Sequence, residues 1–110
     1  MFAATPASIE RAFADHGVLV SRVTRPPEIC YPEGCSAVFS WGGARPIYFK
    51  PRTGKDFMVV LFKQQSDATR LARFEQKNGL GAARRGSLVL LYYKLSPRIA
   101  RLRAALSASA

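Results

Sequence analysis

Hydrophobic residues fall into two patterns along this chain: continuous apolar runs, and apolar positions repeated at helical spacing. The longest runs are residues 57–62 and 88–93, and both are apolar at every position. Uninterrupted runs of this length predict strands that are covered on both faces of a sheet. A shorter run, Val18-Leu19-Val20, predicts a further strand that ends by Val23.

Three segments carry apolar residues at the three- and four-residue spacing of an amphipathic helix. The first begins at Thr5-Pro6, where a threonine N-cap and a proline at the first helical position favour helix formation. Gly17 ends it, because glycine readily adopts the left-handed conformation that follows many helices. The second is predicted from Ser66, as its N-cap, to Asn78, and the third begins at Ser96-Pro97.

The segment between the first strand and the first long apolar run is rich in proline and glycine. Three prolines and a glycine predict that residues 24–36 form a loop without regular structure. Residues 37–41 then predict a strand, Gly42-Gly43 a hairpin turn, and residues 45–49 a returning strand. Pro46 cannot donate a ladder hydrogen bond, so we expect the returning strand at a sheet edge.

The resulting order, α-β-β-β-β-α-β-α, predicts an α+β fold. We expect a two-layer sandwich with a mixed four- to five-stranded sheet and two or three helices on one of its faces. The strand, helix and strand of residues 57–93 have the length of a right-handed parallel crossover, while the hairpins require antiparallel pairs elsewhere. The 110 residues fit a single domain, 1–110, and residues 107–110 are expected to fray.

Charge adds the most unusual feature of the composition, a formal net charge of +10. Residues 1–55 carry seven Lys/Arg and four acids, whereas residues 56–110 carry ten and three. A surface of this sign attracts polyanions or an acidic protein, although the same charge can simply keep a protein soluble. The predicted anion-binding residues are the arginines of the basic second half, Arg84, Arg85, Arg98, Arg101 and Arg103.

Residues 79–86, Gly-Leu-Gly-Ala-Ala-Arg-Arg-Gly, resemble a phosphate-binding loop only superficially. They follow a helix and precede a strand, the reverse of a dinucleotide-binding fingerprint, and Arg84 replaces its third glycine. We expect a flexible joint. Its two arginines either hold one anion or are simply solvated.

The two cysteines, Cys30 and Cys35, form the most specific local motif. Their spacing in a Pro/Gly turn allows a disulfide, and two free thiols are the alternative. We expect no metal, because a zinc site needs about four ligands and only His16 adds to the two cysteines. A disulfide or a removed leader favours an extracytoplasmic location, whereas the absence of a leader here favours the cytoplasm by default.

The sequence contains no catalytic motif, so we predict no catalytic residue and no cofactor, and an enzyme is disfavoured. No run reaches the roughly 18–20 apolar residues of a transmembrane helix. We therefore expect a small non-enzymatic basic domain that acts as a binding or accessory protein, with a polyanion or acidic protein as partner. Nothing in the sequence indicates its process or its oligomeric state.

Two alternatives stand beside this expectation. One is a sequence-nonspecific RNA- or DNA-binding protein that uses the basic C-terminal half. Exposed aromatics on strands strengthen such binding by stacking on bases, and the candidates are Trp41, Tyr48, Tyr92 and Tyr93. The other is a small cysteine-dependent enzyme, in which the fold would have to bring a cysteine to His16.

Overall fold

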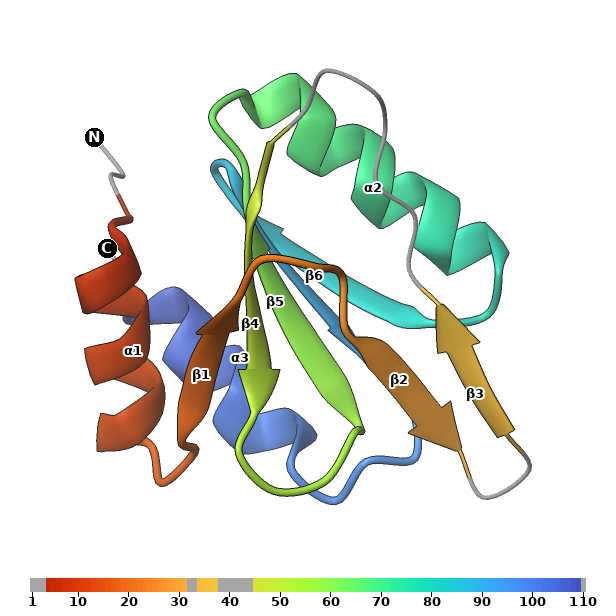
Figure 1. The fold of residues 1–110 in the computed structure, drawn as a ribbon, viewed down its shortest axis with the longest axis horizontal. Coiled ribbons are helices and arrows are strands. Elements are labelled where there is room, and N and C mark those ends of the chain that lie inside the picture. The colour runs from red at the N-terminus through yellow and green to blue at the C-terminus, as the bar shows by residue number, and fades with distance from the viewer. Residues whose placement is uncertain (1–3, 32–33, 38–44, 110) are drawn as a thin grey trace.

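The computed structural model describes residues 4–31, 34–37 and 45–109, and over these residues the chain forms three helices and two sheets (Figure 1). The helices are α1 (Pro6–Asp15), α2 (Gln65–Lys77) and α3 (Ile99–Ser107). The main sheet contains β1 (Val20–Val23), β4 (Ile47–Pro51), β5 (Phe57–Leu61), β6 (Gly81–Arg85) and β7 (Leu88–Tyr92). A separate hairpin pairs β2 (Glu28–Tyr31) with β3 (Gly34–Ala37). The expected α+β class, the five-stranded sheet and the number of helices are confirmed.

The capping residues predicted from the sequence are correct for α1 but not for α2. At α1, Thr5 accepts a hydrogen bond from the Ser8 amide and Ser8 accepts one from the Thr5 amide, so the predicted cap is confirmed. Gly17 follows this helix with φ +77°, as expected. At α2 the N-cap position is Gln64 rather than Ser66, and it makes no side-chain capping bond. No helix within the described residues is long and apolar enough to cross a membrane.

The strands of the main sheet lie in the order β1-β4-β5-β7-β6, and every neighbouring pair is antiparallel. The expected parallel crossover from β5 through α2 does exist, but it leads to β6, which runs in the same direction as β5 without pairing with it. We expected β7 as its parallel partner; instead β7 lies between the two and is antiparallel to both. A two-residue turn, Gly86-Ser87, reverses the chain from β6 to β7, and Gly86 has the positive φ of +59° that such turns favour.

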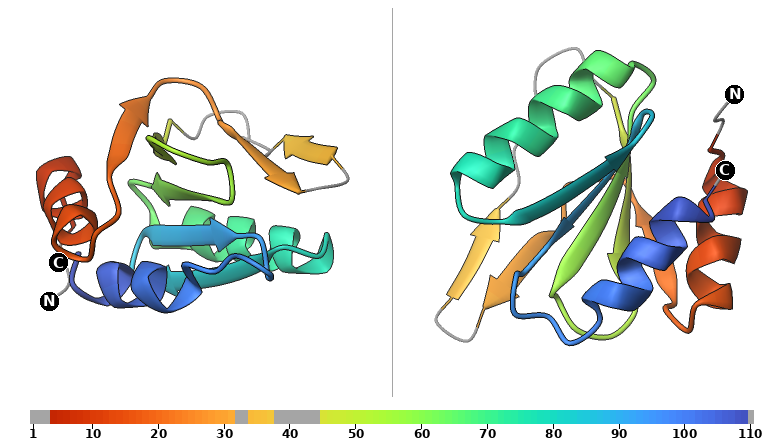
Figure 2. Two further views of the ribbon diagram at one scale, coloured as in Figure 1. Left: turned by 90° about the horizontal axis from the view of Figure 1, so that it is seen from below. Right: turned by 180° about the vertical axis from the view of Figure 1, so that it is seen from behind.

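Helices cover both faces of the main sheet, which corrects the expectation that they share one face. Phe57 and Val59 of β5 point to a first face, covered by α1 and α3, while Met58 and Val60 point to a second face, covered by α2. Figure 2 (left) shows the sheet edge-on between these two layers, with the β2–β3 hairpin on the α2 side. The apolar runs of β5 and β7 require cover on both sides, so the three helices are divided between the two faces.

The β2–β3 hairpin lies in the segment that was expected to be an irregular loop. Pro26 and Pro27 precede β2, so they do not interrupt its pairing with β3. Ile29 is fully buried and joins the core of the second face, which fixes the hairpin against the main sheet. The predicted Gly42-Gly43 turn lies outside the described residues. Residues 38–41 of the strand predicted before this turn lie outside them as well.

One smaller expectation is corrected. The returning strand, β4, is paired with β1 on one side and β5 on the other, so it is not an edge strand. Pro46 is compatible with this position because it precedes the first paired residue, Ile47. Near the C-terminus, Ser109 is buried and its carbonyl oxygen accepts a 2.8 Å hydrogen bond from the Ser8 hydroxyl, which links the end of α3 to α1.

Candidate functional site

Residues 50–56, which span the end of β4 and its connection to β5, carry three cations without a side-chain partner among the described residues, and we call this segment the basic turn. Its side chains Lys50, Arg52 and Lys55 are all exposed to solvent. None of the three makes an ion pair or a side-chain hydrogen bond within the described parts of the chain. They are therefore free to bind an external anion.

Strand alternation determines where Lys50 points. Phe49 and Pro51 on either side of it are buried, and Phe49 belongs to the core of the first face. Because side chains alternate along a strand, Lys50 points to the second face, where the β2–β3 hairpin lies. The start of the basic turn and the chain leading into the hairpin consequently face each other.

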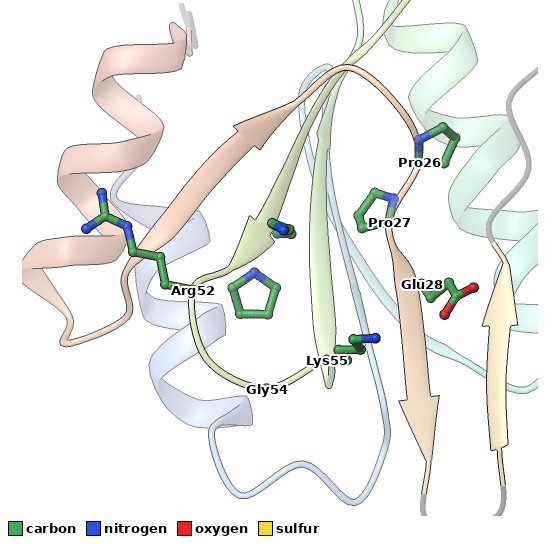
Figure 3. Close-up of a pocket in the computed structure, with 8 residues that line it drawn as sticks. Pro26, Pro27, Glu28, Arg52, Gly54 and Lys55 are labelled. Atoms are coloured by element: carbon green, nitrogen blue, oxygen red, sulfur yellow. The ribbon is translucent and has the colours of Figure 1, made fainter.

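A hollow of about 560 Å³ separates these two segments. It is lined by Pro26, Pro27, Glu28, Lys50, Pro51, Arg52, Gly54 and Lys55. Figure 3 shows Pro26 and Pro27 on one side and Lys55 on the other, with the Arg52 side chain turned away from the prolines. Three cations against the single carboxylate of Glu28 give the rim a net positive charge, and Arg52 extends it outward.

Backbone hydrogen bonds tie the basic turn to three other parts of the fold. The Arg52 amide donates to the Leu19 carbonyl oxygen, 3.0 Å away, at the start of β1. The Lys55 carbonyl oxygen accepts from the Cys30 amide at 2.6 Å, and the Asp56 carbonyl oxygen accepts from the Tyr93 amide at 2.8 Å. These bonds hold the turn in one conformation before any ligand arrives, which lowers the entropic cost of binding.

An ion pair between Asp56 and Arg98 fastens the end of the turn to the start of α3. The Asp56 carboxylate accepts hydrogen bonds from the Ser96 hydroxyl at 2.5 Å and from Arg98 Nε at 3.2 Å, and Arg98 Nη2 contacts its other oxygen. Burial raises the pKa of Asp56, but the hydrogen bonds from Arg98 and Ser96 and the charge of Arg98 together outweigh burial, so its pKa lies below the ordinary value. Arg98 also donates to the Thr53 carbonyl oxygen, 3.1 Å away.

The predicted anion-binding arginines do not form one surface. Arg84 and Arg85 lie on the edge strand β6, where Arg85 pairs in register with Leu88, at the end of the sheet opposite Tyr92. Arg98 lies near the opposite end of the sheet, where Tyr92 pairs with Phe57, and its charge is neutralised by an ion pair with Asp56. The structure thus separates the first two arginines from Arg98.

The remaining two predicted arginines are on α3. Arg103 lies over the ring of Tyr92, 5.7 Å from its centroid, and donates a 2.7 Å hydrogen bond to the Tyr92 hydroxyl. Arg101 is exposed. Arg103 therefore has a structural role against the sheet, and Arg101 is left as an exposed charge on its own.

A second basic hollow, of about 330 Å³, lies along the outer face of α2. It is lined by Ser66, Thr69, Arg70, Arg73, Phe74 and Lys77. Its three cations all come from one helix, at spacings where like charges repel each other.

The cysteines face each other directly across the hairpin. Cys30 and Cys35 are partners in the β2–β3 register, and their sulfur atoms are bonded at 2.04 Å, as the disulfide alternative predicted. His16 lies at the end of α1, on the first face, and its Nδ1 is 2.8 Å from the Ala12 carbonyl oxygen. The hairpin packs on the second face, so the structure does not bring a thiol to the histidine.

One buried acid has a perturbed pKa, which is a common sign of a functional group. Glu75 on α2 is only 4% exposed. Burial raises its pKa, and the hydrogen bond from Asn78 only partly opposes that effect. Glu75 does not line the hollow beside the basic turn, so we do not include it in the site.

The site residues that the sequence analysis missed are Glu28, Lys50, Arg52 and Lys55. The excess of positive charge in residues 56–110 favoured arginines of the second half, whereas this cluster of cations lies at the end of the first half. The available signal was local: Lys50-Pro-Arg-Thr-Gly-Lys55 places three cations within six residues of a Pro/Gly turn.

Comparisons of the chain with protein-family models, curated proteins and solved structures found no match.

Proposed function

We propose that this protein is a small non-enzymatic binding or accessory domain that holds a polyanion at the basic turn. The observation that carries the proposal is the arrangement of Lys50, Arg52 and Lys55. They are exposed, they lack partners within the described residues, and their backbone is fixed by hydrogen bonds to three other segments. Cations of this kind bind phosphate or sulfate groups through charge and hydrogen bonds.

The ligand's charged groups, rather than its bases, are the expected recognition element. Base stacking needs exposed aromatic rings, and Tyr48 and Tyr92 are 3% and 6% exposed. Tyr93 is half-buried and Trp41 lies outside the described residues. Sequence-nonspecific binding of RNA or DNA is therefore one form of the same function, with contacts limited to the phosphate backbone.

The reactive groups of the described residues support a binding protein more than an enzyme. Both cysteines are bonded to each other, His16 contacts a backbone carbonyl oxygen, and Asp56 is paired with Arg98. Each of these groups already has a structural partner. A nucleophile beside a general base, the usual requirement for covalent catalysis, is not assembled among them.

The proposal is tested by binding of labelled short mixed-sequence RNA and of inorganic polyphosphate at low salt. Replacing Lys50, Arg52 and Lys55 together by glutamine should weaken the binding of both probes by roughly tenfold or more, because three phosphate contacts are lost. The matched control replaces Lys63, Arg73 and Lys77 by glutamine, which removes the same charge around α2. Equal losses in the two variants would show that only net charge matters, and the absence of binding by the wild type would reject the function.

A further inference from the structure

The β2–β3 hairpin gathers three side chains that can ligate a metal ion. Glu28 and Cys30 are two residues apart on β2 and so point to the same side of the hairpin. Cys35 lies directly opposite Cys30 on β3. The carboxylate oxygen of Glu28 and the two sulfur atoms all lie within 4.8 Å of one another.

We propose that the reduced hairpin binds a thiophilic divalent cation of the zinc type, with the carboxylate of Glu28 and the thiolates of Cys30 and Cys35 as ligands. Two sulfurs and one oxygen form a ligand set that suits Zn²⁺. Because the protein supplies three ligands, the fourth position of a tetrahedral ion remains open to water or to another ligand. The expectation of no metal counted only cysteine and histidine, so it left Glu28 out.

Formation of the site requires two chemical steps. A dithiol reductant transfers two electrons and two protons to the Cys30–Cys35 disulfide; the S–S bond breaks, two thiols form, and the reductant becomes a disulfide. Binding of Zn²⁺ then forms two Zn–S bonds and releases both thiol protons to solvent. The Glu28 carboxylate supplies the third ligand through one of its oxygen atoms.

The hairpin is held in place in a way that favours binding after reduction. Ile29, between the two β2 ligands, is fully buried against the main sheet. The Cys30 amide donates to the Lys55 carbonyl oxygen at 2.6 Å. Neither contact is made through a sulfur atom, so both remain available to hold β2 after reduction, and β3 is paired with β2 in antiparallel register.

Disulfide and metal therefore exclude each other at this site. The oxidised hairpin has no thiolate to offer, whereas the reduced hairpin replaces one covalent link by metal–ligand bonds between the same two strands. Glu28 also lines the hollow beside the basic turn. The proposed site is nevertheless independent of polyanion binding, because its ligands include none of the three cations.

The test uses the full chain, reduced with a phosphine in the absence of oxygen, and titrated with Co²⁺ as a spectroscopic substitute for Zn²⁺. The expected result is one Co²⁺ per chain with thiolate-to-cobalt charge-transfer absorption, lost when one equivalent of Zn²⁺ is added. The oxidised protein should show no such absorption. No charge-transfer band from the reduced wild type, or an equal band from the oxidised protein, would overturn the proposal.

Variants test the ligand set. Glu28→Gln should weaken Zn²⁺ binding at least as much as the roughly 10–100-fold that loss of an outer-shell partner costs. Asp15→Asn removes the same charge from an exposed position on α1 and should leave binding unchanged. Glu28 is itself exposed, so its variant is expected to fold, and circular dichroism checks this directly. Unchanged affinity in Glu28→Gln would remove the carboxylate from the site and contradict the proposal.

Discussion

At the scale of single residues, Gly81 shows how one side chain can exclude another. A Cβ atom built at this position would lie 2.2 Å from Cε2 of Tyr92, its partner in the β6–β7 register. The ring cannot easily move away, because Arg103 donates to its hydroxyl at 2.7 Å. Only glycine fits beneath this ring.

Replacing Gly81 by alanine should therefore lower the free energy of unfolding by about 1–3 kcal/mol, the usual cost of overpacking. Urea denaturation measures the change. The control repeats the substitution in a Tyr92→Ala background, where the obstructing ring is absent and the additional cost should largely disappear. A cost that is the same in both backgrounds would show that the ring is not its cause.

The Asp56–Arg98 pair gives a pH-dependent prediction. Asp56→Asn should destabilise the protein at neutral pH by about 1–3 kcal/mol, because hydrogen bonds to a charged group are weakened. The folded state lowers the pKa of Asp56, so the carboxylate's contribution is complete above its ordinary pKa of about 3.9 and is lost as pH falls through the lower folded-state value.

Unfolding curves of the wild type and Asp56→Asn, measured from neutral pH down to about pH 3, check this window. The difference in stability between the two proteins should be constant above about pH 5 and should shrink below about pH 4. Asp15→Asn, which alters an exposed acid with no partner among the residues that the structure describes, is the control and should show a small difference throughout. A gap between the wild type and Asp56→Asn that widens toward acid would contradict the assignment.

Residue-level features were predictable from sequence where they are local. Thr5 with Pro6, and Gly17, act through the few residues beside them, and the structure confirms their roles. Asp56 and Arg98 are 42 positions apart, and nothing near either residue indicates the other. Their pairing follows from the fold, so only the structure reveals it.

At the scale of elements, β6 was missed because its composition is typical of a loop. Gly81, Ala82, Ala83, Arg84 and Arg85 have low to moderate preference for strands, and glycines surround them. Pairing with the strongly apolar β7, aided by the two-residue turn at Gly86-Ser87, outweighs that weak preference. By contrast, β5 and β7 were predicted correctly because every residue in them favours a buried strand.

The β2–β3 hairpin gives the testable prediction at this scale. Replacing Cys30 and Cys35 together by serine should lower the free energy of unfolding by at most about 2 kcal/mol, because the closed loop is short. The effect should be concentrated in the hairpin. Hydrogen–deuterium exchange should become faster at the Cys30 amide, which donates to Lys55, while the amides of β5 and β7 remain protected.

Exchange in β7 provides the internal control for that experiment. Leu90 and its neighbours are fully buried at the centre of the sheet, so their exchange reports global unfolding. If the Cys30 amide stays as protected in the serine variant as in the oxidised wild type, the disulfide does not stabilise the hairpin, and the prediction is wrong.

At the scale of the whole molecule, the net charge of +10 favours the proposed polyanionic ligand but does not indicate where on the surface it would bind. The second half is the more basic, yet two of its five predicted arginines have structural roles, Arg98 against Asp56 and Arg103 against Tyr92. The basic turn keeps its cations unpaired among the described residues because the bonds that anchor it use backbone atoms and the Asp56 carboxylate, not the side chains of Lys50, Arg52 or Lys55. Counting charges along the sequence cannot separate these two situations.

The salt dependence of RNA binding tests the central claim most directly, because its slope counts the phosphate contacts. The logarithm of the association constant is measured against the logarithm of salt concentration for the wild type, for the variant with glutamine at Lys50, Arg52 and Lys55, and for the variant with glutamine at Lys63, Arg73 and Lys77. Loss of three contacts to a single strand should make the slope of the basic-turn variant shallower by about 2. The α2-side variant should keep a slope close to that of the wild type. Equal slopes for the wild type and the basic-turn variant would contradict the proposal that this turn holds the polyanion.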